Sequence, residues 1–158
     1  MASLPRADLV ARISLAGAAI ERHVSDTLAA EGWPRVGSGH GYVIQRLLTG
    51  PQQVTAMAGD LGITQQAVSK TVKELVAAGL ARQTIDAQDS RRRPVELTER
   101  GQAVVSRSRE IRADLQREMA ARNGARDLAA AGRVLDGVLD RLGLTERIAS
   151  RTVPAPAR

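Results

Sequence analysis

The sequence has 158 residues but no cysteine and no phenylalanine, and Trp33 and Tyr42 are its only large aromatic residues. Without cysteine the chain cannot form disulfides, thiol redox switches or thiolate metal sites. With so few aromatic rings it is poorly suited to bind single-stranded nucleic acid by stacking bases. The core is therefore expected to consist of leucine, valine, isoleucine and alanine.

The chain also lacks long apolar segments. No apolar run approaches the ~20 residues that a membrane-spanning helix needs. The first ten residues, MASLPRADLV, contain no apolar region typical of a signal peptide. The sequence therefore predicts a cytoplasmic location and no membrane partner, and its length favours one domain with room for a core.

Basic residues exceed acidic ones: 23 lysines and arginines against 17 aspartates and glutamates give a formal net charge of +6. Lys70 and Lys73 are the only lysines, and the other basic residues are arginine. Such an excess favours an anionic partner, nucleic acid first and a membrane surface second. An arginine-rich proteome would produce the same excess, so the charge alone assigns no function.

Residues 64–79 show the clearest helical pattern in the chain. The apolar residues Val68, Val72, Leu75 and Val76 repeat at helical spacing, which predicts one buried face. An ordinary amphipathic surface helix has this pattern. A helix that enters the major groove of DNA has it as well.

The ends of this segment carry helix-terminating residues. Thr64 can cap the start through its hydroxyl oxygen, and Gly79 can end the helix as a left-handed residue. At about 100° per residue the side opposite the apolar face is polar. Its members are Gln66, Lys70 and Lys73, with Ser69 on the flank.

A shorter helix is predicted just before, over residues 54–61, with Thr55 as its cap. Gly62 breaks that helix and can adopt the positive φ of a tight turn. Ala58 is small where two helices would cross closely, and Val68 begins the buried face of the next helix. Together these features predict a helix-turn-helix. Two helices that are adjacent only in sequence are the alternative.

Two short alternating segments, residues 80–85 and 95–97, predict a hairpin with Pro94 at a strand entry. The connection between them is polar and strongly charged. A charged loop can remain in solvent, or it can contact phosphates and the minor groove. Its position directly after a helix-turn-helix favours contact with DNA. The charged residues concerned are Asp89, Arg91, Arg92 and Arg93.

The rest of the sequence predicts further helices, over residues 7–30, 42–48, 98–122 and 128–142. The first of these is longer than a small domain needs for its own core, so part of it is expected to pack on another chain. Residues 32–41 are rich in glycine and predict a loop, and residues 150–158 predict a disordered tail.

The order of these elements resembles the MarR family of dimeric winged helix-turn-helix regulators. The family's helix-turn-helix pattern is matched by Ala58, Gly62, Val68, Ser69, Leu75, Gly79, Leu80 and Arg82, with Met57 in place of the usual leucine. The family's wing pattern is matched by Asp89, Arg91, Val95, Leu97, Thr98 and Gly101. Close motif matches cover about residues 54–105, and the helix order covers nearly the whole chain.

The resemblance implies a mainly α fold with a small β-hairpin wing, in which a winged helix-turn-helix core is flanked by dimerisation helices. The implied parts are an N-terminal dimerisation helix (1–31), a DNA-binding domain (32–101), C-terminal dimerisation helices (102–149) and the tail (150–158). It also implies a homodimeric repressor of an inverted-repeat operator in double-stranded DNA, released by a small anionic or lipophilic effector. The alternative is a dimeric architectural or protein-interaction module that binds DNA nonspecifically.

Residue chemistry divides the predicted DNA contacts of residues 64–79 into two groups. Gln65 and Gln66 lie in the first helical turn, nearest to base edges, and a glutamine amide can pair with adenine. Lysine ammonium groups are better suited to phosphates because they carry little sequence information. Serine can contact a base or a phosphate. The predicted DNA-contacting residues of the helix are Thr64, Gln65, Gln66, Ser69, Lys70 and Lys73.

In the predicted wing, Arg91 is the candidate for insertion into a narrow minor groove, where the negative potential is enhanced. Asp89 either holds Arg91 in position or is simply a residue favoured in turns. Arg92 and Arg93 are expected to touch backbone phosphates or solvent.

His23, Trp33, His40 and Tyr42 are the remaining candidates for a binding site. They could line an effector pocket, which the family places between dimerisation helices and DNA-binding core. The favoured alternative is that the two aromatic residues pack in the protein interior and the two histidines lie in solvent. The histidines do not belong to a recognisable metal-ligand set, and no nucleophile–base pair stands out. The sequence therefore predicts no metal, no cofactor and no enzymatic activity.

Overall fold

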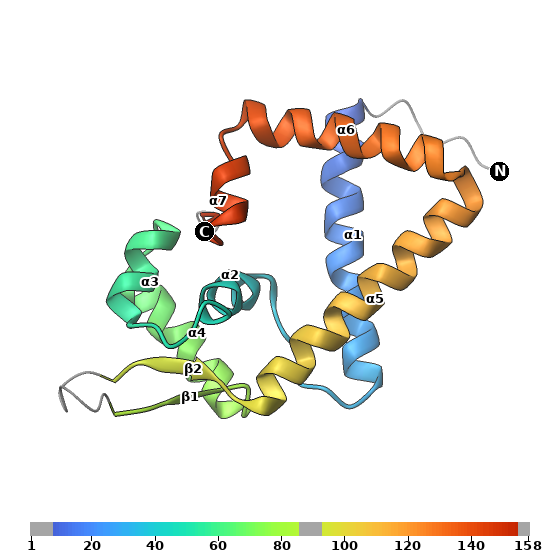
Figure 1. The fold of residues 1–158 in the computed structure, drawn as a ribbon. Coiled ribbons are helices and arrows are strands. Elements are labelled where there is room, and N and C mark those ends of the chain that lie inside the picture. The colour runs from blue at the N-terminus through green and yellow to red at the C-terminus, as the bar shows by residue number, and fades with distance from the viewer. Residues whose placement is uncertain (1–7, 86–92, 155–158) are drawn as a thin grey trace.

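A computed structural model describes residues 8–85 and 93–154. These ranges contain seven helices and a two-stranded antiparallel sheet (Figure 1). In chain order they are α1 (Leu9–Ala30), α2 (Ser38–Leu47), α3 (Val54–Leu61), α4 (Gln65–Ala77), β1 (Ala81–Gln83), β2 (Val95–Leu97), α5 (Glu99–Asn123), α6 (Ala125–Arg141) and α7 (Thr145–Ala149). The predicted mainly α fold with a β-hairpin is confirmed. No helix of the described ranges is long and apolar enough to cross a membrane.

The helix-turn-helix is formed by α3 and α4. Gly62 ends α3 with φ of +64°, and the N–H of Ile63 donates to the Ala58 carbonyl at 3.1 Å. Thr64 then begins α4, where its hydroxyl oxygen accepts the Ala67 N–H at 3.2 Å. The expectation that Thr55 caps α3 is wrong, because α3 begins one residue earlier, at Val54, and its start has no side-chain cap.

One apolar core holds α4 in place, and leucine, isoleucine, valine, methionine and alanine supply it. Val68, Val72 and Leu75 of α4 are buried in it as predicted. Val76 is 41% exposed, which contradicts its predicted place on the buried face. It follows Leu75 directly, so a rotation of about 100° carries its side chain past the edge of that face. The buried face of α4 is therefore narrower than predicted.

The hairpin pairs β1 with β2, with Ala81 opposite Leu97. Strand β1 is shorter than the predicted segment 80–85, whereas β2 has the predicted bounds. The Thr84 N–H continues the pairing by donating to the Pro94 carbonyl at 2.9 Å. On the other edge, Gln52 and Val95 exchange two backbone hydrogen bonds of 2.9 and 2.8 Å. The wing is therefore attached to the segment before α3 as well as to α4.

The turn between the hairpin and α5 is tightly packed. The Thr98 hydroxyl donates to the Gly79 carbonyl at 2.7 Å and accepts the Gly101 N–H at 3.0 Å. Gly79 has φ of +72°, as expected for a left-handed helix end. A Cβ atom on Gly101 would lie only 2.0 Å from the Leu80 carbonyl oxygen. Glycine is therefore required at position 101 for the backbones to approach.

The predicted loop over residues 32–41 is wrong in its last part, because α2 already begins at Ser38. The Gly37 N–H donates to Nδ1 of His40 at 2.8 Å, which satisfies a backbone donor at the helix start. Packing of Val43, Ile44 and Leu47 in the core outweighs the low helix propensity of the glycines.

The C-terminal end also differs from the expectation. A short additional helix, α7, follows Gly143, and the structure describes the chain as far as Pro154. The last four residues of the expected tail, 155–158, lie outside the described residues.

The long helices α1 and α5 cross and are joined by ion pairs. Arg107 contacts Glu31 at 2.6 Å, and Arg112 contacts Glu21 at 2.8 Å. The hydrogen bonds from Arg107 lower the pKa of the Glu31 carboxyl below its ordinary value. Helix α6 follows α5 after Gly124 and contacts α5 and α7 (Figure 1). Within the described part of the chain, none of its residues is buried.

We expect Gly101→Ala to lower the free energy of unfolding by roughly 1–3 kcal/mol, because the Leu80 backbone would have to move. Gly59→Ala is the matched control, since a Cβ there meets open space in the exposed part of α3. The control should stabilise the protein by about 0.5–1 kcal/mol through helix propensity. Urea unfolding of both variants measures the difference, and equal effects would contradict the steric argument.

Candidate nucleic-acid interface

The exposed side of α4 gathers most of the residues predicted to contact DNA. Six residues line a shallow depression along it: Gln65, Gln66, Ser69, Lys70, Lys73 and Glu74. The first five were predicted from the sequence. Thr64 lies exposed at the N-terminus of the same helix, where its side chain serves as the cap.

Glu74 is the member of this surface that the sequence interpretation missed. Its carboxylate lies 2.8 Å from Nε2 of His40 and 4.0 Å from Nζ of Lys70. The spacing of Lys70 and Glu74, four residues apart on one helix, was a signal that could have identified the pair. The contact with His40 had no local signal, because it joins residues 34 positions apart.

His40 connects the start of α2 to α4. Its Nδ1 accepts the Gly37 N–H, so Nε2 carries the proton in the neutral ring and donates to Glu74. The His40 side chain is only 18% exposed. The imidazole therefore orients the one carboxylate on a surface that otherwise carries amides, a hydroxyl and two ammonium groups.

The electrostatics of the exposed side of α4 favour an anion near its first turns. Free backbone N–H groups and the helix dipole add positive potential at the N-terminus, where Gln65 and Gln66 lie. Lys70 and Lys73 add two full positive charges one and two turns further along. Glu74 offsets part of that charge at the far end.

The wing is described only at its base. Arg93 is exposed next to β2, whereas Asp89, Arg91 and Arg92 lie outside the described residues. Across the base, Arg82 and Glu96 form an ion pair of 2.7 Å between the two strands. The hairpin extends from the C-terminal end of α4 away from α5 (Figure 1).

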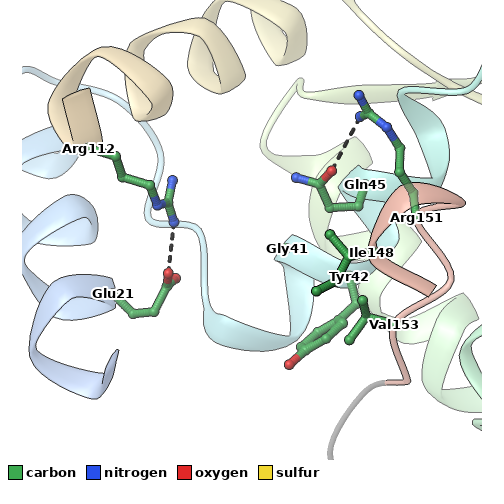
Figure 2. A pocket seen from close by; sticks show the side chains of 8 residues that line it. All are labelled: Glu21, Gly41, Tyr42, Gln45, Arg112, Ile148, Arg151 and Val153. Carbon is green, nitrogen blue, oxygen red and sulfur yellow. Dashed lines mark hydrogen bonds and ion pairs between the residues drawn. The ribbon is translucent and has the colours of Figure 1, made fainter. Parts of the chain in front are cut away.

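The structure does not bring the four proposed effector residues together. His23 is exposed on α1, Trp33 packs against the core, and His40 contacts Glu74. Only Tyr42 lines a cavity of about 420 Å³, which lies between α1, α2, α5 and the C-terminal segment (Figure 2). The described residues contain no group of three or more His, Asp or Glu side chains that could hold a metal ion.

A comparison of the sequence with models of protein families finds a match for the segment that contains these features. Residues 42–92 match the model of the MarR family. The helix-turn-helix segment is similar to the MarR family. This match covers the predicted DNA-contacting residues of α4 and, of the predicted wing residues, Asp89, Arg91 and Arg92; Arg93 lies just beyond it. It agrees with the resemblance drawn from the helix-turn-helix residues. No curated protein sequence matches the chain.

Solved structures show that the MarR-family fold extends over nearly the whole chain. The reduced form of MarR from E. coli is 19% identical and has a TM-score of 0.67, with 86% of this chain and 99% of that chain covered. A mutant MepR from S. aureus, bound to an oligodeoxyribonucleotide, is 17% identical with a TM-score of 0.62 and covers 87% and 99%. A transcriptional regulator from Thermotoga maritima is 21% identical with a TM-score of 0.58 and covers 87% and 94%. At these identities the similarity establishes the fold.

We expect His40→Ala to lower the free energy of unfolding by about 1 kcal/mol, because two hydrogen bonds are lost. One joins the imidazole to the Gly37 N–H at the start of α2, and the other joins it to Glu74 of α4. His40→Asn should recover part of this loss, since the shorter amide can still accept the Gly37 N–H but cannot reach Glu74. Chemical unfolding curves of the two variants test the assignment. Equal stability of His40→Ala and the unmodified protein would show that His40 does not tie the helices together.

Proposed function

We propose that this chain is a homodimeric transcriptional repressor that binds an inverted-repeat operator in double-stranded DNA and is released by a small-molecule effector. The observation that carries the proposal is the exposed surface of α4. It presents two amides, a hydroxyl and two ammonium groups, and it is followed directly by a hairpin wing. A MepR mutant with the same fold has been solved bound to an oligodeoxyribonucleotide, which supports a DNA ligand.

In this proposal α4 is the recognition helix in the major groove. Gln65 and Gln66 lie in its first turn and read base edges through their amides. Ser69 contacts a base or a phosphate, and Lys70 and Lys73 bind phosphates. On the wing, Arg91 enters the minor groove, Asp89 positions it, and Arg92 and Arg93 contact the backbone.

The exposed apolar side chains of the terminal helices support a homodimer. Isolated exposed apolar residues are ordinary, but contiguous apolar surfaces mark interaction sites. A second copy with two-fold symmetry would cover them and place two recognition helices on one side of the DNA. The exposed residues are Leu9, Val10 and Leu15 on α1 and Val134, Leu135 and Val138 on α6.

The cavity beside Tyr42 is the proposed effector site. Its volume lies within the range of small-molecule pockets. Arg112 and Arg151 lie on opposite sides of it, and Glu21 already pairs with Arg112 (Figure 2). The local charge therefore suits a small molecule with an apolar body and one anionic group. Because the cavity borders both α2 and the long helices, an occupant could change how the DNA-binding unit sits on them.

DNA affinity should fall steeply with ionic strength. If each protomer makes ~3–5 ionic phosphate contacts, the logarithm of the association constant falls with a slope of about −0.9 per contact against the logarithm of salt concentration. Fluorescence anisotropy with labelled duplexes across a salt series measures this slope. The regulator should also prefer its operator over random duplex by roughly 10³-fold or more. A flat salt response would exclude DNA binding, and a ratio near one would favour a nonspecific architectural role.

Substitutions on α4 should separate sequence reading from phosphate binding. Lys73→Ala should weaken binding to all duplexes similarly and make the salt slope shallower by about 0.9 per protomer. Gln66→Ala should leave the salt slope unchanged and reduce the preference for the operator by about 1–3 kcal/mol per lost base contact. Affinities for operator and base-substituted duplexes measure both effects. The opposite pattern would reverse the roles assigned to the two side chains.

A further inference from the structure

The last described part of the chain, residues 145–154, folds back onto the DNA-binding unit, and we refer to it as the C-terminal strap. It contains α7 and follows Gly143 at the end of α6 (Figure 1). Two side chains fasten it to α2. Nη1 of Arg46 donates to the Ser150 carbonyl at 3.2 Å, and Nη1 of Arg151 donates to Oε1 of Gln45 at 3.3 Å (Figure 2 shows the second contact).

Arg46 joins the strap to the helix-turn-helix. Its Nη2 contacts Asp60 of α3 at 2.5 Å, so one guanidinium holds α2, α3 and the strap together. The Arg46 side chain is only 12% exposed, and its buried Nε has no partner among the described residues. Removing the Ser150 carbonyl would leave another donor of this group unpaired, which disfavours the present position of Arg46. The strap and the α2–α3 contact therefore share one guanidinium.

The unfavourable backbone conformation of Arg151 indicates that its side chain, which contacts Gln45, has a structural role. Its φ of +58° makes it the only non-glycine residue with positive φ in the described ranges. It ends α7 in a Schellman motif, in which Thr152 donates to Arg147 at 2.8 Å and Arg151 to Ile148 at 3.2 Å. Gly143 occupies the corresponding position after α6, with φ of +67°. An L-residue in this conformation costs about 1–2 kcal/mol, so a glycine would fit the backbone better.

The strap also forms a wall of the cavity. Ile148, Arg151 and Val153 line it on one side, and Glu21 and Arg112 line it on the other (Figure 2). A molecule that enters this space must contact the strap. It can compete for the Arg151 guanidinium, or it can displace the two apolar side chains.

We propose that the C-terminal strap is a latch that couples the cavity to DNA binding. Docked on α2, it keeps Arg46 in its position on Asp60 and so holds the helix-turn-helix in its DNA-binding arrangement. A molecule in the cavity releases the strap and weakens operator binding. This inference rests on the proposed function, which supplies the operator, but strap docking can be measured without DNA.

Thiol labelling measures docking, because the chain has no cysteine of its own. Val153→Cys introduces a single thiol on the strap, and Thr55→Cys places a control thiol on the exposed surface of α3. The strap thiol should react with Ellman's reagent several-fold more slowly than the control thiol. Gln45→Ala should accelerate only the strap thiol, since it removes the contact between Arg151 and Gln45 and leaves the backbone of the strap unchanged. Equal rates for the two thiols in the otherwise unmodified chain would overturn the latch.

Operator binding measures the coupling, with a duplex that the full chain selects from a random pool as the probe. Deletion of residues 145–158, and separately Gln45→Ala, should lower operator affinity by about fivefold or more, the lower end of typical coupling between sites. Deletion of residues 155–158 alone, which leaves the strap intact, is the matched control and should change little. Light scattering at the same concentrations ensures that only samples of equal oligomeric state are compared.

The outcomes separate the two proposals. If neither the deletion of residues 145–158 nor Gln45→Ala changes operator affinity, the latch is overturned and the regulator proposal stays in place. Selection of no preferred sequence by the full chain would overturn the regulator proposal, and with it the operator coupling of the latch, while the labelling rates would still decide whether the strap docks.

Discussion

Helix α4, the hairpin and α5 meet at Thr98, and the arrangement of the helix-turn-helix and the hairpin depends on this junction. Its hydroxyl bonds to the Gly79 carbonyl at the end of α4 and to the Gly101 N–H at the start of α5. The close approach of Gly101 to the Leu80 carbonyl leaves no room for a side chain. Because backbone atoms and one short side chain make these contacts, they fix the angle between helix and hairpin more rigidly than long, flexible surface side chains could. The direction in which the wing leaves α4 follows from this packing.

Helix α2 has a second organising role, since both of its ends carry side chains that reach other elements. His40 at its start orients Glu74 on the exposed side of α4. Arg46 near its end contacts Asp60 of α3 and the Ser150 carbonyl of the strap. A small displacement of α2 would therefore change its contacts with both helices of the helix-turn-helix. The cavity lies against the same helix, at Tyr42 and Gln45, so α2 borders both the cavity and the helix-turn-helix.

The two halves of the chain differ in how they bury apolar surface. The helix-turn-helix, the hairpin and the adjoining parts of α1, α2 and α5 share one core. Helix α6, by contrast, leaves Leu135 and Val138 exposed, and the far end of α1 leaves Leu9 and Val10 exposed. Ion pairs such as Arg107–Glu31 hold α1 and α5 together but are themselves partly solvated. The exposed apolar side chains thus lie on α6 and the far end of α1, whereas the helix-turn-helix and the hairpin share one buried core.

The sequence by itself determined the helix-turn-helix, the cap of α4 and the hairpin, because these depend on residues close together in the sequence, although the predicted cap of α3 was wrong. The cap at Thr64 and the left-handed turn at Gly62 need no distant partner. The exposed polar side of α4 follows from helical periodicity. The predicted burial of Val76 was wrong, because the width of a buried helix face depends on which elements pack against it. Only the tertiary structure showed the pairing of His40 with Glu74 and the contact between Arg46 and Ser150. These contacts join residues 34 and 104 positions apart, and local patterns of charge and hydropathy carry no information about such distant pairs.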